Sequence, residues 1–490
     1  MPSLRVLSVV ILVGMGAAVA AVGGSGDSGE PVNEPRGALI ISRPDPTSPG
    51  TAATFDVRAE NQREGTPGWR ISRARGTKAG LAGYAGAVSV LPGQPVPLSV
   101  NADGPVRIRA LRIGWYDGVG ARQVWQGTLR AQPETADPGH WQARGLADTT
   151  GWPEGHYLLR LDQGAASRYL PLTVRSADSR GRIVVLTSPL TWQAENRPAA
   201  PASTGRTALP TVSFNRPYAD GYGSAGFLPN DAGIVQLAER SGQRLGFLTD
   251  YDVATDPALL TGAAAVLVGG DSQYWTASLR TAVRAVGEAG TNLAFFGAGT
   301  GARQVRLVDA GRALQISRAK PATSVQLTGL RPSCSTKPSG TGAAGAGWVV
   351  SNADWWGYRG TGVQTDDVLP GLIFDRVDRA STSATGSPHP MQVLSFAQTA
   401  CPSPAGPVPQ SGVYLVRPSG AGVFAAGTGR WACALTGACT SRSGKAVRLD
   451  EKTKRVVTRI TRNVIAAFAT AEAGRRFSAK DSVSQYSALR

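Results

Sequence analysis

Histidine is scarce in this chain of 490 residues, and its positions limit the chemistry that the protein can perform. Only His140, His156 and His389 are present, and none of them follows a predicted parallel strand. A serine or cysteine nucleophile usually works beside a base, most often histidine. The GAGTG segment at 297–301 has neither Ser nor Cys and does not continue as G-x-G-x-x-G. These absences argue against a Ser–His or Cys–His hydrolase and against dinucleotide binding at that turn.

Lysine is also rare, since arginine outnumbers it by 44 to 7, and the net charge is +17. The arginine excess accompanies many Ala and Gly residues, which indicates coding bias. The basic residues are scattered except for a run from Arg442 to Arg462, largely on a predicted helix whose other face is apolar. This pattern favours a solvated face, compatible with an anionic cell surface, over a nucleic-acid interface. We expect no specific nucleic-acid partner.

Long apolar runs are absent except at the N-terminus, where Val6–Val22 follows Arg5. An A-x-A-like cleavage site at Ala18–Ala20 makes residues 1–22 a predicted signal peptide. An uncleaved membrane anchor is the alternative, because the run is at the short limit for a spanning helix. Residues 23–50 are rich in Gly, Ser, Pro and Asp and are predicted to be a flexible linker. The chain is therefore expected to be secreted or held in the cell envelope.

Only four cysteines are present, and there is no C-x-x-C pair. An even number in an exported chain suggests two disulfides, with three possible pairings. We favour Cys433–Cys439, closing a small loop, and Cys334–Cys401, joining two loops. A zinc site is the less favoured alternative, since His389 is the only histidine near them in sequence.

Short strand-like runs separated by turn signals occupy residues 51–176. This spacing predicts an antiparallel, Ig-like β-sandwich domain. The runs are Ala87–Leu91, Val96–Val100, Val106–Ile113, His156–Leu161 and Tyr169–Val174.

After a boundary near 177–181, apolar strands alternate with amphipathic helices, which predicts an α/β domain over 182–475 with a mainly parallel sheet covered on both faces. A β-strand and loop insertion is expected around 305–440, and residues 476–490 are a tail. The expected strands are Ile183–Thr187, Leu245–Thr249, Ala263–Val268 and Asn292–Phe296, and the expected helices are Asn230–Ser241, Thr276–Ala289 and Glu451–Ala471.

Polar and aromatic side chains follow the expected parallel strands, where open α/β sheets bind ligands. Glu195, Asp271 and Gln273 are the catalytic candidates. A carboxylate metal site at Glu195, Asp250, Asp252 and Asp271 is a less favoured alternative, because acidic residues at strand ends often cap helices. The ligand-binding candidates are Trp192, Arg216, Tyr218, Asp250, Asp252, Tyr274 and Trp275.

Five segments in series resemble the N,N-dimethylformamidase β-subunit family, and the likeness continues more weakly to the C-terminal helix. They are LRIGWYDGVGAR (111–122), VVLTSPLTWQAEN (184–196), VSFNRPY (212–218), GGDSQYWTASLRTAV (269–283) and GTNLAFFGAGT (290–300), followed by VLPGLIFDR (368–376) and GVFAAGTGRWA (422–432). The resemblance implies a β-sandwich followed by a glutamine-amidotransferase-like α/β domain. It also implies amide hydrolysis by an iron ion held by tyrosine and glutamate side chains.

Two motifs depart from the family pattern. Family members typically have TWQAYN and GHDEYW, whereas this chain has TWQAEN and GDSQYW. Glu195 stands in the place of a tyrosine, and Asp271, Ser272 and Gln273 stand in the places of His, Asp and Glu. A neutral glutamine amide is a weak iron ligand, so no cofactor is expected.

These changes favour a secreted binding protein without the iron-dependent chemistry. Its partner would be an unknown small molecule or a cell-surface ligand. The alternative is a hydrolase of altered specificity, acting on an amide or glycan through Glu195 and Asp271.

Overall fold

The computed structural model describes residues 55–135, 137–196, 211–317, 324–335, 346–374, 376–381, 390–402, 405–437, 439–440 and 446–486. The predicted signal peptide (1–22) and linker (23–50), as well as His389, lie outside the described residues. Phe55–Arg490 forms one compact unit. Within the described part, no helix is long and apolar enough to cross a membrane.

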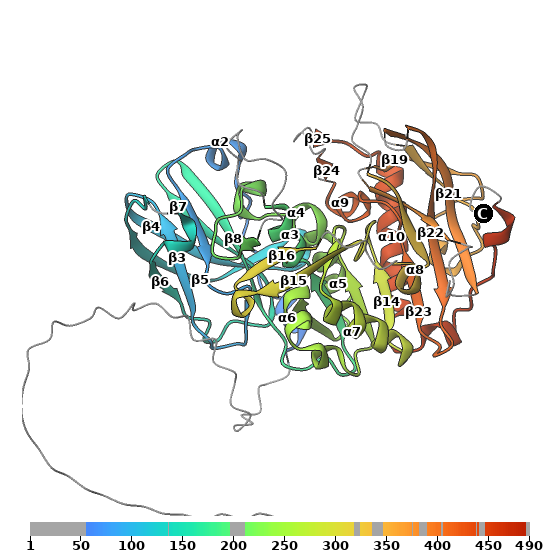
Figure 1. The fold of residues 1–490 in the computed structure, drawn as a ribbon, viewed down its shortest axis with the longest axis horizontal. Coiled ribbons are helices and arrows are strands. Elements are labelled where there is room, and N and C mark those ends of the chain that lie inside the picture. Colours follow the sequence, from blue (N-terminus) through green and yellow to red (C-terminus); the bar gives the residue numbers. More distant parts are fainter. Residues whose placement is uncertain are drawn as a thin grey trace, which may run out of the picture. The chain divides into compact units, whose positions relative to one another are not determined.

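Two sheets form the first part of this unit around a shared apolar core (Figure 1). Leu98 from one sheet and Ile108 and Leu159 from the other are buried in this core. All five predicted strands are present, and the pairing is antiparallel except for β2 with β8, which is parallel. The sheets are β1-β3-β6 and β2-β8-β7-β4-β5, with β1 Ala82–Ala85, β2 Ser89–Val90, β3 Val96–Asn101, β4 Gly104–Ile113, β5 Ala121–Ala131, β6 Ala143–Ala147, β7 Gly155–Gln163 and β8 Ala166–Val174.

The central sheet has seven strands in the order β11-β9-β12-β14-β23-β22-β21. The first five are parallel to one another, and β22 is antiparallel to both of its neighbours. The mainly parallel sheet is thus present, and β9 and β11 begin and end as predicted. The strands are β9 Ile183–Thr187, β11 Leu245–Thr249, β12 Ala265–Val268, β14 Asn292–Phe295, β21 Met391–Pro402, β22 Ala405–Val416 and β23 Gly422–Ala425.

The region 305–440 differs from the expected decoration of the core. Its strands β21, β22 and β23 belong to the central sheet itself. Most of their described side chains are buried, as in Val413–Leu415 and Val423–Ala425, and the exposed ones lie around the turn between β21 and β22. Local spacing did not indicate this, because a long segment separates β14 from β23 in the sequence and its Gly, Pro and Ser content resembles that of surface loops.

Helices cover both faces of the central sheet, as the strands' continuous apolar content predicts. Alternate side chains point to opposite faces, so that Val185 faces one apolar core and Val184 the other. One core includes helices α5 (Ala232–Arg240), α9 (Trp431–Thr436) and α10 (Glu451–Ala467). The other includes α3 (Pro189–Glu195), α6 (Asp250–Thr255) and α7 (Ala277–Glu288).

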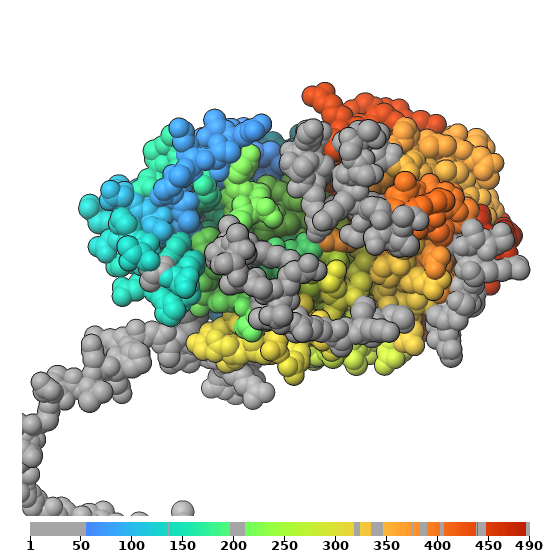
Figure 2. Space-filling view, turned by 45° about the horizontal axis from the view of Figure 1, so that its top comes forward, coloured from blue at the N-terminus to red at the C-terminus, as the bar shows by residue number. Residues whose placement is uncertain are grey.

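A buried charge pair joins the first two sheets to the helices that cover the central sheet. Arg112 of β4 donates to Glu239 of α5 at 2.6 Å, and both side chains are fully buried. The Tyr116 hydroxyl accepts from Arg112 and donates to Glu60, which extends the network. Figure 2 shows the blue and cyan residues of the first two sheets directly against the green part of the chain. Separating the two parts would leave an uncompensated buried charge, which disfavours their separation.

Both predicted disulfides are present and include all four cysteines. Cys334 of β17 (Leu330–Ser335) bonds to Cys401 of β21, so this bridge joins strands, not the loops that were expected. Cys433 of α9 bonds to Cys439 of the short strand β24 (Cys439–Thr440). The zinc alternative is wrong, since no thiol is free to bind a metal.

Candidate functional site

The three catalytic candidates meet beyond the carboxyl ends of the central parallel strands. Strand β9 leads into α3, whose last residue is Glu195. Strand β12 ends at Val268 and is followed by a turn that holds Asp271 and Gln273. Because β9 and β12 are neighbours and parallel, these two chain segments emerge at the same edge of the sheet.

A fourth side chain, Arg376, connects them. Its Nη2 donates to Glu195 Oε1 at 2.7 Å, and its Nη1 donates to Asp271 Oδ1 at 2.8 Å. Gln273 Nε2 donates to the same two oxygens, at 3.0 and 2.9 Å. The two carboxylate oxygens therefore lie within about 6 Å of each other, since both accept from one nitrogen. We call Glu195, Asp271, Gln273 and Arg376 the Arg376 network.

The network is shielded from solvent except at Glu195. The exposed fractions are 4% for Gln273, 14% for Asp271, 16% for Arg376 and 30% for Glu195. Partial burial strengthens charge-assisted hydrogen bonds because water competes less for the donors and acceptors. Glu195 is thus the member most available to a ligand.

Arg376 reaches the strand ends by long-range backbone pairing. It begins β20 (Arg376–Ala380), and its carbonyl oxygen accepts from the Gly429 amide at 3.1 Å. Gly427 donates in turn to the Gly297 carbonyl, also at 3.1 Å. The segment after β23 is therefore hydrogen bonded both to β20 and to the loop after β14, and this places Arg376 at the site. Sequence reasoning missed Arg376, although it is the last residue of the VLPGLIFDR segment that resembles the family.

Asp378 is a second residue that sequence reasoning missed. Its Oδ2 accepts from the Gly299 amide at 2.7 Å, while Oδ1 is buried and has no hydrogen-bond partner within the described residues. Burial raises the pKa of Asp378 to about 7, although the charge of Arg376 opposes this shift. A Cβ on Gly299 would lie 3.6 Å from both Arg376 Cδ and Gln273 Cγ, so Asp378 and the network flank the same turn.

Two further carboxyl groups are buried near strand ends, Asp250 directly after β11 and Asp231 beside Gly269, which follows β12. Asp250 Oδ1 accepts from the Leu190 amide at 3.0 Å. Neither oxygen of Asp231 makes a hydrogen bond of normal geometry in the described part of the chain, although the Trp192 side chain lies close enough to favour the charged form. Burial raises the pKa of both groups well above its usual range, and for Asp231 the charges of Asp250 and Asp271 add to the shift. Uncharged carboxyl groups are therefore favoured here.

Asp252 has a structural role at the start of α6. It forms a capping box with Thr249, in which Thr249 Oγ1 accepts from the Asp252 amide and Asp252 Oδ2 accepts from the Thr249 amide. Its other carboxylate oxygen accepts from Ser89 of β2 and lies 3.7 Å from Arg175. Asp252 therefore caps helix α6, and none of these contacts is with a member of the Arg376 network.

The aromatic candidates differ in their exposure. Trp275 is fully buried and its Nε1 donates to Ser272 Oγ at 2.9 Å. Tyr274 is 4% exposed, and its amide donates to Thr191 Oγ1. Trp192 is 8% exposed and packs edge-to-face against other aromatic rings. Trp275 presents no surface to a ligand here, and for Tyr274 and Trp192 a binding role stays a prediction.

The segment that carries Arg216 and Tyr218 lies against the end of α3. Asn196 Nδ2 donates to the Pro217 carbonyl at 3.0 Å, and Asn196 Oδ1 accepts from the Ala219 amide at 3.1 Å. The Tyr218 ring packs edge-to-face on Trp192 at a centroid distance of 6.5 Å. Burial lowers the pKa of Arg216 and raises that of Tyr218. These two candidates are therefore held beside α3, while Asp250 is hydrogen bonded at the other end of that helix.

The fold and the site together define an α/β protein with a polar site beyond the carboxyl ends of a mainly parallel sheet. The family model described as "N,N-dimethylformamidase beta subunit-like, C-terminal" matches residues 107–443, which include all four members of the Arg376 network. This chain belongs to that family. No curated protein matches the chain.

Proposed function

We propose that this protein is a secreted or envelope-associated binding member of its family that lacks the iron-dependent amidase chemistry. The observation that supports this most directly is the Arg376 guanidinium lying between Glu195 and Asp271, at 2.7 and 2.8 Å. A cation bound by two carboxylates supplies there the positive charge that a metal ion would otherwise supply.

The side chains around Arg376 do not fit the iron site that the family resemblance implies. Glu195 and Gln273 stand where the family has a tyrosine and a glutamate, and the amide of Gln273 directs its donor nitrogen to both carboxylates. An amide in that orientation offers the centre of the network an N–H group, not a lone pair. The oxygens that face the centre are already hydrogen bonded to Arg376. In the described part of the chain, no group of three or more His, Cys, Asp or Glu is placed to hold a metal ion.

The decisive experiment combines metal content with turnover. The mature protein, produced with iron in the medium, is expected to contain far less than one iron per chain and to leave N,N-dimethylformamide unhydrolysed. One iron per chain together with turnover that disappears in E195Q would overturn the proposal. S278A, at a hydroxyl that donates to the Ala254 carbonyl and is not part of the network, is the control for substitution as such.

A second candidate function is a hydrolase of altered specificity that uses Glu195 and Asp271. It is favoured because their two carboxylate oxygens lie within about 6 Å of each other, a limit that allows the roughly 5–5.5 Å spacing of the paired carboxyl groups in retaining glycosidases. It is disfavoured because the two oxygens that define this separation both accept from Arg376. A panel of simple amides and of β-linked and α-linked glycosides tests it. Hydrolysis of any of them that is abolished by both E195Q and D271N would establish this second function.

We also propose the finer architecture and location. The two sheets around one core support an Ig-like sandwich ending near residue 176, and the five parallel strands support a glutamine-amidotransferase-like fold from residue 182. The two disulfides support an oxidising, extracellular location. Fractionation of the producing cells tests the location, and recovery of the protein in the reduced state from the cytosol would contradict it.

A further inference from the structure

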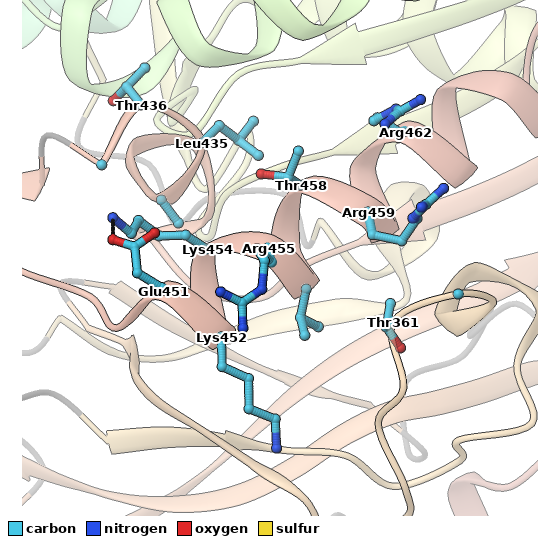
Figure 3. A pocket seen from close by; sticks show the side chains of 14 residues that line it. Thr361, Leu435, Thr436, Glu451, Lys452, Lys454, Arg455, Thr458, Arg459 and Arg462 are labelled. Atoms are coloured by element: carbon cyan, nitrogen blue, oxygen red, sulfur yellow. Dashed lines mark hydrogen bonds and ion pairs between the residues drawn. The ribbon is translucent and has the colours of Figure 1, made fainter.

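A groove of about 560 Å³ lies along helix α10, apart from the Arg376 network (Figure 3). Its walls are the exposed face of α10, the end of α9 at Leu435–Gly437, and the turn at Gly360–Thr361. None of the four residues of the Arg376 network lines it. It is therefore a separate feature of the surface.

The groove carries a strong positive charge. Five of its lining residues are basic and one, Glu451, is acidic. Lys454 pairs with Glu451, and Lys452 pairs with Asp367 at 3.3 Å. The remaining three are Arg455, Arg459 and Arg462, all of them exposed, and no acidic partner for them is found within the described residues.

The three arginines are arranged as a line. They occur at positions i, i+4 and i+7 of α10, so they share one face of the helix. At 1.5 Å rise per residue, neighbouring arginines are displaced along the axis by about 6 and 4.5 Å. Guanidinium groups bind phosphate oxygens through two parallel hydrogen bonds. A row of this length matches several successive anionic groups better than a single small ion.

Both walls of the groove are held in place. Asn463 Nδ2 donates to the carbonyl oxygens of Gly357 and Arg359, at 2.9 Å each, which fixes the turn before Gly360 onto α10. On the other side, Trp431 Nε1 donates to Thr461 Oγ1 at 2.9 Å and ties α9 to α10. The Cys433–Cys439 disulfide closes the loop that follows. A rigid groove loses less conformational entropy on binding than a flexible one.

We propose that this groove binds a linear polymer of phosphate groups without bases. The Thr458 hydroxyl lies on the same helix between Arg455 and Arg459 and can donate to a phosphate oxygen, whereas the hydroxyls of Thr361 and Thr436 already donate to the carbonyl oxygens of Tyr358 and Cys433. No aromatic side chain is found among the residues that line the groove, whereas proteins that hold single-stranded nucleic acid stack bases on aromatic rings. The lining therefore favours a phosphate backbone over a nucleic acid.

Fluorescence anisotropy with labelled inorganic polyphosphate tests the proposal on the mature chain. R455Q/R459Q/R462Q is expected to weaken binding at least tenfold and to make its salt dependence shallower, because three counterion-releasing contacts are lost. The matched control R73Q/R107Q/R130Q removes the same charge from three exposed arginines of the sandwich part and is expected to change affinity less than twofold. Equal losses in both variants would show a net-charge effect and overturn the site.

Two competitors sharpen the test. Inorganic phosphate at the same total phosphate concentration is expected not to displace polyphosphate, and efficient displacement would indicate a single-anion site instead. An oligothymidylate with the same number of phosphates is expected to bind more weakly. If the oligothymidylate binds more tightly than polyphosphate and the triple variant loses this binding, the groove is a nucleic-acid site and the proposal is wrong. Absence of any polyphosphate binding at low salt would also overturn it.

Discussion

The Arg376 network and the α10 groove use arginine in opposite ways. In the network, one half-buried guanidinium meets two carboxylates that come from different segments of the chain. In the groove, three exposed guanidinium groups lie on one helix face and have no acidic partner in the described part of the chain. The first arrangement satisfies its charges internally, whereas the second leaves its charges available to a partner. Charge content alone would not have distinguished them, since both sit in a chain with a large arginine excess.

Removing the paired arginine has the largest expected effect. Arg376→Met leaves Glu195 and Asp271 close together without a counter-charge, so the free energy of unfolding is expected to fall by about 3 kcal/mol, the lower end for a buried pair because Glu195 is partly exposed. Urea denaturation measures this loss. The triple variant E195Q/D271N/R376M is expected to recover most of it. A loss that persists in the triple variant would mean that packing of the arginine, and not its charge, matters.

Asp378 lies beside the Arg376 network, but its buried Oδ1 has no hydrogen-bond partner within the described residues. Its folded pKa of about 7 lies above the value of an unfolded Asp, so the folded state holds a proton that the unfolded state releases between these two values. The contribution of this group to stability is thus fully present below the pKa of an unfolded Asp and is lost as the pH rises from there through the folded pKa of about 7.

D378N removes this titration while keeping an acceptor for the Gly299 amide. At pH 8 the variant is expected to be more stable than the native chain by at least about 2 kcal/mol, with little difference at pH 4. Urea denaturation at both pH values measures this. An equal effect at the two pH values would contradict the assigned titration.

The Cys433–Cys439 disulfide connects the stability of the fold with the groove. It closes a loop with a sequence separation of only 6, so C433S/C439S is expected to lower the free energy of unfolding by about 1.5 kcal/mol. The same variant is expected to bind polyphosphate about threefold more weakly, because the wall at Leu435–Gly437 becomes less rigid. Thermal denaturation and anisotropy measure the two effects, and an unchanged affinity would separate the disulfide from the groove.

The smallest effect on stability is expected for the groove arginines themselves. R455Q/R459Q/R462Q is expected to change the free energy of unfolding by less than about 0.5 kcal/mol, since exposed side chains without partners contribute little. A loss as large as that of R376M would mean that the three arginines have acceptors and that the groove is not free to bind a ligand.

Local sequence patterns accurately predicted several strands and helices of the α/β part. β9 and β11 match their predicted bounds, and α7 differs by one residue at each end. Asp271 and Gln273 were predicted because the turn after a buried parallel strand is where such sheets place polar groups. The predictions failed for β21–β23, whose membership of the central sheet depends on pairing across a long intervening segment.

The sequence by itself determined several strands and helices, among them β9, β11 and α7, the departure of two motifs from the family pattern, and the identity of the candidate residues Glu195, Asp271 and Gln273. Period-two and 3.6-residue patterns, caps and turn residues are local, so they can be recognised without a fold. Only the tertiary structure decided which arginine is paired. Arg376 lies 181 residues from Glu195 and 105 from Asp271 along the chain. It meets them because β20 pairs with the segment after β23, which in turn is hydrogen bonded to the loop after β14. Whether a charge is satisfied depends on groups brought together by packing, which local sequence does not encode.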